Sequence, residues 1–206
     1  MRGVLRVLHA VGIEREHVHI HVDAALAGGY WPLDEHAPKY VLGEDFDSIS
    51  ISAHKWWGGV VGGVVLLSAA ACSAQAESGA YVPYLQITDR MISGCRDGLI
   101  APLWQARMRQ LEWGDEYARC VGLCEIFEAA LGKSRVPHAR QPHSLIIVFP
   151  RPSERTVELF QLATVDDEAH VVVLPHATEE ALLWLAELVA RNYQATRAHT
   201  VMAAEE

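Results

Sequence analysis

The order of apolar and polar residues predicts that helices and strands follow each other along the N-terminal half of the chain. Residues 4–11 have apolar positions at helical spacing, whereas residues 17–25, HVHIHVDAA, alternate at the two-residue period of a strand that runs into a turn. Residues 48–52 alternate in the same way. The nearly continuous apolar run at residues 60–68 is typical of a strand that is buried on both faces.

The C-terminal half predicts a long helix and then a smaller unit. Residues 99–131 have helical character, with possible interruptions at Gly114 and Gly122. After the segment PHARQPHS, the pattern predicts a strand, a helix, a strand and an amphipathic helix, at residues 144–150, from about 153, 170–175 and 177–193. We therefore predict an α/β fold with a first domain at residues 1–131 and a small C-terminal domain at 132–206.

Two helical patterns predict buried side chains. In the last helix, we expect Trp184 to form a buried stripe with the leucines at 182, 183, 185 and 188, and Thr178 to cap the helix ahead of two glutamates. Cys120 and Cys124 lie four residues apart on the predicted long helix, and we interpret them as small core residues rather than half of a zinc site.

Composition narrows the classes of partner. The chain has 206 residues, of which 50% are hydrophobic, and its net charge is −9. The chain also lacks a cluster of arginine and lysine residues. The negative charge and the missing cluster together argue against a nucleic-acid partner. The N-terminus lacks the pattern of a signal peptide, and no apolar run approaches the roughly 20 residues that span a bilayer. We therefore expect a cytoplasmic protein with no membrane partner.

The strand HVHIHVD offers one candidate site. Strand alternation would place three histidines and a carboxylate on one face, namely His17, His19, His21 and Asp23. Metal ligands converge within about 2 Å of an ion, but side chains two apart on a strand start roughly 6 to 7 Å apart, so all four could not bind one metal. A metal-dependent hydrolase, a mixture of surface and core histidines, and a role for Asp23 and one histidine in another site all stay open.

A second candidate site joins Asp23 to Lys55, because each residue lies at the end of a predicted strand and ligands gather at such ends in α/β sheets. Lys55 stands among Trp56, Trp57 and glycines, where burial would make its amine nucleophilic. Such an amine could bind the aldehyde of pyridoxal phosphate, which also needs an acid, small residues against its ring and donors for its phosphate. Candidates for these roles are Asp23, Ala25, Ser52 and His54. The alternative is that Lys55 extends into solvent and Asp23 caps the next segment.

Four segments together resemble one enzyme family. HVDAALAGGYWPL (21–33) and DSISISAHKWWGG (47–59) closely resemble the core of the group II pyridoxal-phosphate-dependent amino acid decarboxylases, especially the branch of bacterial histidine decarboxylases and plant serine decarboxylases. TDRMISGCRDG (88–98) and SLIIVFPRPSE (144–154) are similar to two further segments of that branch. The resemblance implies a fold-type I transferase of the aspartate aminotransferase class, with part of its large domain followed by a small α+β domain.

The resemblance also implies roles for individual residues. Lys55 would form the Schiff base with the cofactor, Asp23 would pair with the pyridine nitrogen, and Ala25 would pack on the ring. Ser52 and His54 would contact the phosphate side, with His54 close to the cofactor. The family site lies at a dimer interface, which residues 93–98 would approach from the neighbouring protomer. Met91 and Cys95 replace a threonine and a serine of the family pattern.

The implied activity is decarboxylation of an amino acid to its amine. The substrate would be histidine, serine or an aliphatic amino acid such as valine. A transaminase would use the same Asp23 and Lys55 with an arginine for the carboxylate, and Arg96 and Arg151 exist. Family members extend much further on the N-terminal side of the DAA motif, where this chain has only residues 1–22. We therefore expect a C-terminal piece of a decarboxylase or, alternatively, a non-catalytic truncated relative, with exposed sheet edges and apolar surface.

Overall fold

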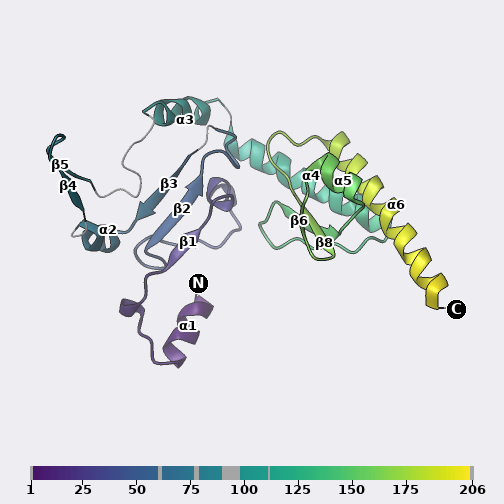
Figure 1. The fold of residues 1–206 in the computed structure, drawn as a ribbon, viewed down its shortest axis with the longest axis horizontal. Coiled ribbons are helices and arrows are strands. Elements are labelled where there is room, and N and C mark those ends of the chain that lie inside the picture. The colour runs from purple at the N-terminus through teal and green to yellow at the C-terminus, as the bar shows by residue number, and fades with distance from the viewer. Residues whose placement is uncertain (1, 60–61, 77–78, 90–97, 111, 205–206) are drawn as a thin grey trace. The chain divides into compact units, whose positions relative to one another are not determined.

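The structure is a computed structural model that describes residues 2–59, 62–76, 79–89, 98–110 and 112–204 (Figure 1). The chain divides into two compact units, an N-terminal unit, Met1–Leu111, and a C-terminal unit, Glu112–Glu206. The division into domains at residues 1–131 and 132–206 stays a prediction. No helix in the described ranges has both the length and the apolar character of a membrane span.

The N-terminal unit is built on a three-stranded sheet in the order β1-β2-β3. β1 (His21–Asp23) and β2 (Ser48–Ser52) are parallel, whereas β3 (Gly63–Leu67) runs antiparallel to β2. Around it lie helices and a hairpin: α1 (Arg2–Ala10), α2 (Ala69–Ala76), α3 (Ile100–Met108), and β4 (Ala80–Val82) with β5 (Ile87–Asp89). The sequence correctly predicted the strand at 48–52.

The strand predicted from residue 17 is shorter in the structure. Arg15–His17 form a 3-10 helix, and β1 begins only at His21. The reason is that side chains bind the intervening backbone: Arg15 Nη1 donates to the Val18 carbonyl at 2.7 Å, and Asp47 Oδ2 accepts from the Ile20 amide at 2.7 Å. His17 therefore does not share a strand face with His21 and Asp23.

The expectation that residues 60–68 are buried on both faces is wrong for this chain. Within this run, β3 is an edge strand of the sheet, and Val65 and Leu66 are 62% and 48% exposed. These are successive residues of a strand, so they belong to opposite faces. Gly63 approaches β2 so closely that a Cβ atom there would lie 2.4 Å from the Ile51 carbonyl oxygen, which explains why the strand begins with glycine.

The helix predicted over residues 99–131 is two helices, α3 and α4 (Trp113–Lys133). The break precedes Gly114, because Glu112, at the N-cap position of α4, has an extended backbone with ψ 93°. Gly122 lies inside α4 without interrupting it. The roughly 1 kcal/mol that a helical glycine costs is offset by burial of the neighbouring side chains on the inner face, among them Cys120, Cys124 and Phe127.

The C-terminal unit packs helices on an antiparallel sheet. Its strands β6 (Ile146–Pro150), β8 (Glu168–Val172) and β7 (Ala163–Val165) lie in the order β6-β8-β7, and α4 packs against α6 (Glu179–Ala204). The short helix α5 (Glu154–Phe160) joins β6 to β7. The sequence predicted β6, α5, β8 and α6 with shifted bounds, but it missed the three-residue strand β7.

Phe127 and Phe149 form the centre of the C-terminal core, with their rings edge to face at 5.6 Å. Cys120 and Cys124 are both fully buried, so their prediction as core residues is confirmed. Burial raises the pKa of the Cys120 thiol to about 11 and that of the Cys124 thiol to about 12. Both thiols are therefore protonated and unreactive near neutral pH.

The buried stripe predicted on the last helix is only partly correct. Leu182 and Leu185 are 4% and 0% exposed, but Trp184 is 49% exposed and instead packs edge to face on Phe160 at 5.2 Å. The helical period explains the error, because residues 182, 185 and 189 face the core and residue 184 turns away from it. The predicted cap is confirmed, since Thr178 Oγ1 accepts from the Ala181 amide at 3.2 Å.

Replacing Phe127 by alanine should destabilise the C-terminal unit by about 3 to 5 kcal/mol, because the change opens a cavity against Phe149. The matched control is Leu159→Ala on α5, which removes a side chain that is 52% exposed and should cost within about 0.5 kcal/mol. Urea unfolding of the full chain, followed by far-ultraviolet circular dichroism, measures both. Equal losses would contradict the assigned core.

Candidate active site

The carboxyl ends of β1 and β2 bring the sequence-predicted residues of the second candidate site to one edge of the sheet. Asp23 is in register with Ser50, the Ala24 amide donates to the Ser50 carbonyl at 3.0 Å, and the Ser52 amide donates to the Ala25 carbonyl at 3.0 Å. Because both strands run in the same direction, the chain leaves the sheet after each of them at the same edge. The predicted juxtaposition of these strand ends is therefore found in the structure.

Asp23 presents an exposed carboxylate at this edge. Its Oδ1 accepts from the Ala25 amide at 3.0 Å, which closes a local turn directly after the strand. This contact orients the carboxylate while leaving the group accessible to solvent. Ala25 itself is half-buried and adds only a methyl group to the edge.

Lys55 lies on a tight turn that follows β2. Ala53 and Trp56 are 0% and 1% exposed, whereas His54 and Lys55 between them are exposed. The Gly59 amide donates to the Ala53 carbonyl at 3.0 Å and closes the turn. The expectation that Lys55 is buried among tryptophans is therefore wrong in this chain, since its neighbours are buried and the lysine projects outward.

Trp56 anchors the turn from inside. Its ring packs so closely on Gly29 that a Cβ atom at Gly29 would lie 2.7 Å from Trp56 Cδ1, and Tyr30 meets it edge to face at 5.4 Å. Trp56 is thus a packing residue. The 3-10 helix Ala27–Gly29, which follows Asp23 in the chain, is in this way held against the turn that carries Lys55.

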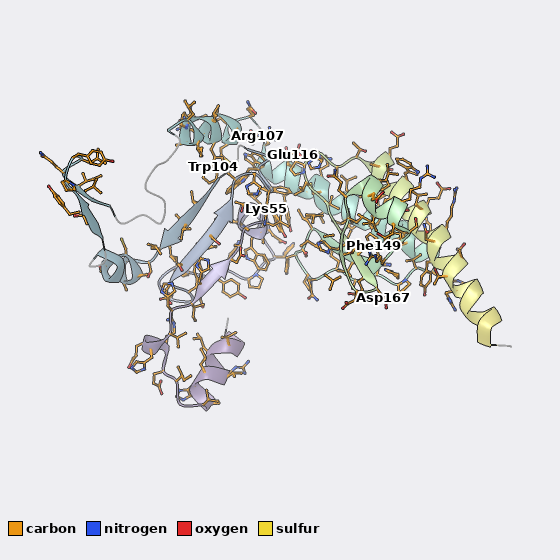
Figure 2. The ribbon with its side chains drawn as sticks, viewed as in Figure 1. Lys55, Trp104, Arg107, Glu116, Phe149 and Asp167 are labelled. Atoms are coloured by element: carbon orange, nitrogen blue, oxygen red, sulfur yellow. The ribbon has the colours of Figure 1, made fainter. Side chains whose placement is uncertain are left out.

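Helix α3 contacts the same turn. Arg107 Nε donates to the Trp57 carbonyl at 2.9 Å, and the ring centroids of Trp57 and Trp104 lie 5.1 Å apart. Figure 2 labels Trp104 and Arg107 on this helix. Nothing in the sequence singled out Trp104 or Arg107, because both lie in an ordinary helical pattern far along the chain from Lys55.

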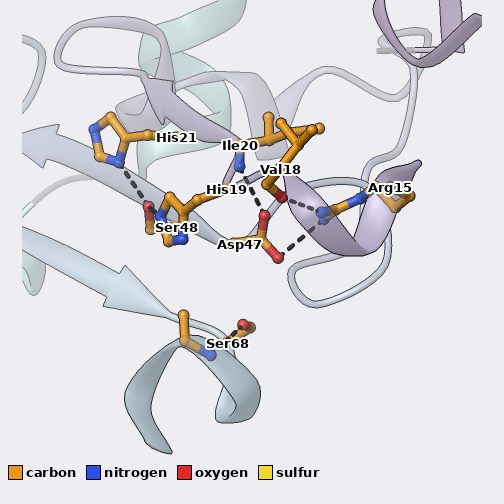
Figure 3. Close-up of polar contacts among 9 residues, drawn as sticks. Arg15, Val18, His19, Ile20, His21, Asp47, Ser48 and Ser68 are labelled. Atoms are coloured by element: carbon orange, nitrogen blue, oxygen red, sulfur yellow. Dashed lines mark hydrogen bonds and ion pairs between the residues drawn. The ribbon is translucent and has the colours of Figure 1, made fainter. Parts of the chain in front are cut away.

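A chain of hydrogen bonds crosses the face of β1 and β2 that carries Asp23. Ser48 Oγ lies 2.8 Å from His19 Nε2 and 2.7 Å from His21 Nδ1 (Figure 3). His21 Nε2 also lies 3.2 Å from Ser50 Oγ. Ser48 is only 2% exposed and has one proton to donate, so at least one of the two imidazoles donates to it. The serine alternation in SISIS was the sequence signal for this network.

The metal interpretation of HVHIHVD gains no support from the geometry. His19 and His21 are hydrogen-bonded to serines, and His17 lies on a different element. Within the ranges that the structure describes, no three or more His, Cys, Asp or Glu side chains stand in a metal-binding arrangement.

Arg15 and Asp47 form a part-buried ion pair at the start of the two strands. Arg15 Nη2 lies 2.9 Å from Asp47 Oδ1, and Asp47 Oδ2 accepts from the Ile20 amide (Figure 3). The hydrogen bond from Arg15, together with that from Ile20, holds the pKa of the Asp47 carboxyl below its usual value. This ion pair ties the segment before β1 to the segment before β2.

The remaining predicted residues lie outside the described residues or in the C-terminal unit. Met91, Cys95, Arg96 and most of the segment 93–98 lie outside the described residues. Arg151 lies in the C-terminal unit, where Nη2 contacts Glu154 Oε1 at 2.8 Å. A dedicated carboxylate arginine of the transaminase type is therefore not identified among the described residues.

Comparison with curated proteins finds histidine decarboxylases. The chain is 32% identical over 179 residues to histidine decarboxylase from Vibrio campbellii, covering 85% of this chain and 46% of that protein. It is 31% identical over 187 residues to histidine decarboxylase from Pseudomonas fluorescens, covering 85% and 45%. The chain thus spans less than half the length of these relatives. No protein-family model matches it.

Solved structures with the same fold are pyridoxal-phosphate enzymes of fold-type I. L-methionine decarboxylase from Streptomyces sp. 590 superposes with a TM-score of 0.67 at 21% identity, covering 84% of this chain and 42% of that chain. Sphingosine-1-phosphate lyase from Burkholderia pseudomallei gives a TM-score of 0.67 at 18% identity, covering 98% and 50%. The predicted fold class is therefore confirmed.

Replacing Asp47 by asparagine should destabilise the N-terminal unit by about 1 to 2 kcal/mol at pH 7, because the partner of Arg15 is lost. The pKa of Asp47 is lowered on folding, so its contribution is complete above the pKa of the unfolded chain and is lost as the pH falls through the folded value. The difference between wild type and variant should therefore shrink below about pH 4.

Urea unfolding followed through the amide signals of Ile20 and Ala24 measures this difference at each pH. The exposed Glu44→Gln, which removes the same charge from the same loop, is the matched control. A difference that stays constant down to pH 2 would contradict the ion pair.

Proposed function

We propose that this chain carries the lysine and aspartate part of the active site of a group II pyridoxal-phosphate-dependent amino acid decarboxylase. The observation that carries the proposal is the parallel pairing of β1 with β2, which leaves Asp23 and the Lys55 turn at one edge of the sheet. The 32% identity to a histidine decarboxylase over 85% of the chain supports the same family and the branch of bacterial histidine decarboxylases.

The chemistry of the residues at this edge fits pyridoxal phosphate. An exposed amine suits the aldehyde, an exposed carboxylate suits the protonated ring nitrogen, and the methyl group of Ala25 suits close packing against a flat ring. Ser52 and His54 offer a hydroxyl and an imidazole to an anionic phosphate. Similarity of fold to L-methionine decarboxylase, a protein solved with L-methionine methyl ester, supports this assignment.

Each residue then has a distinct task. Asp23, held by the Ala25 amide, keeps a proton on the ring nitrogen. The bound cofactor supplies an electron sink for the pair of electrons that the departing carboxylate leaves behind. Lys55 would hold the cofactor through its amine. Decarboxylation replaces the lost carboxylate by one proton on the α-carbon, and the Lys55 and His54 side chains would be the groups that supply this proton.

The substrate class is an L-amino acid, and the product is its amine. Histidine is favoured by the relatives at about 30% identity, while serine and valine stay as alternatives. The whole enzyme would be a cytoplasmic homodimer whose site lies at the interface between its protomers. Exposed apolar side chains on the β4–β5 hairpin, among them Tyr81 and Ile87 at 62% and 53%, support an interface there.

The second candidate is a non-catalytic relative of the same fold, which the exposure of Val65 and Leu66 on β3 favours. It would retain the sheet but hold no cofactor at Lys55. The two candidates differ in one measurable property, the selective reaction of Lys55 with pyridoxal phosphate.

We expect pyridoxal phosphate to react selectively with Lys55 when the purified chain is incubated with it and reduced with borohydride. Peptide mapping should find the label at Lys55 in at least about tenfold excess over Lys39 and Lys133, because the site also binds the ring and phosphate. Lys55→Arg should abolish selective labelling, whereas the matched Lys133→Arg should leave it unchanged. Amine release from histidine, serine and valine is then screened. Equal labelling of all lysines would favour the non-catalytic candidate.

A further inference from the structure

The turn that carries Lys55 is held at two points by different parts of the N-terminal unit. On the inside, Ala53 and Trp56 are buried, and Trp56 packs on Gly29. On the outside, the Trp57 carbonyl accepts from Arg107 Nε at 2.9 Å, across 50 residues of sequence. The exposed Lys55 lies one residue before Trp56 and two residues before Trp57.

The hydrogen bond from Arg107 to the Trp57 carbonyl helps to fix the backbone conformation at Lys55. The Gly58 amide donates to the Lys55 carbonyl at 3.1 Å, and Gly58 has a φ of +57°, which residues other than glycine rarely adopt. The Trp57–Gly58 peptide is therefore bonded at both ends, through its carbonyl to Arg107 and through its amide to Lys55. A rotation of this peptide would break both contacts and reorient the lysine backbone.

Arg107 is itself well placed to stay fixed. Its Nη1 lies 3.3 Å from Gln110 Oε1, and Trp104, one turn earlier on α3, packs against Trp57 with ring centroids 5.1 Å apart. The planar guanidinium thus makes contacts in more than one direction, which a single lysine ammonium reproduces only in part. Figure 2 shows Trp104 and Arg107 on α3 near Lys55.

We propose that Arg107 is a positioning residue for Lys55, acting through the Trp57 carbonyl, with Trp104 as its support. This inference rests on the proposed function, because it assigns Arg107 the task of holding the cofactor lysine in its reactive direction. Arg107 contacts the turn that carries Lys55 and not the reacting atoms. It would therefore affect the affinity of Lys55 for the cofactor.

The test compares Arg107→Gln and Arg107→Lys with Arg109→Gln, an exposed arginine at the end of the same helix. Loss of a charged hydrogen bond should raise the dissociation constant of pyridoxal phosphate at Lys55 roughly tenfold in Arg107→Gln. Arg107→Lys should recover part of the loss, Arg109→Gln should resemble wild type, and labelling of Lys133 should be equal in all. The absorbance of the bound cofactor gives the constant.

A second measurement uses the chain without cofactor. Amide hydrogen exchange at Gly58 and Gly59 should be several-fold faster in Arg107→Gln than in wild type, while exchange in β2 should be unchanged. Unchanged exchange at the turn, or equal acceleration throughout the N-terminal unit, would overturn a positioning role. If the wild-type chain does not bind pyridoxal phosphate at Lys55, the proposed function is wrong. The exchange measurement still decides whether Arg107 holds the turn.

Discussion

The parallel pairing of β1 with β2 is the constraint on which the candidate site depends. Two parallel strands deliver the segments that follow them to one edge of the sheet. Asp23 and Lys55, which are 32 residues apart in the sequence, can therefore contact one ligand. The Arg15–Asp47 ion pair joins the segments before both strands and thereby supports the register from the opposite end. Asp23 and the Lys55 turn owe their juxtaposition to this pairing rather than to a direct contact between their side chains.

The Lys55 turn separates residues that hold it from residues that can react. Trp56 and Ala53 are buried and supply its stability, while His54 and Lys55 stay accessible. Close packing of Trp56 against Gly29 excludes any larger residue there, so the segment after Asp23 packs directly against the segment after β2. Under the proposed function, this packing would let Lys55 meet a cofactor with little loss of conformational entropy.

The two units differ in how they are stabilised. The C-terminal unit has a complete aromatic and aliphatic core around Phe127 and Phe149. In the N-terminal unit, by contrast, Val65 and Leu66 on β3 stay exposed, and hydrogen bonds of Asp47 and Ser48 link the segments around β1 and β2. The N-terminal unit should therefore respond more to pH and to polar substitutions, and the C-terminal unit more to loss of core volume.

The sequence by itself determined β2, the strand-end positions of Asp23 and Lys55, the buried Cys120 and Cys124, and the cap at Thr178. These features follow from local periodicity and from residue types that act within a few positions. Only the tertiary structure decided that β1 starts at His21 and that Arg107 binds the Trp57 carbonyl. The physical reason is that each depends on contacts between distant segments, separated by 32 residues for Arg15 and Asp47 and by 50 for Arg107 and Trp57, which no local pattern encodes.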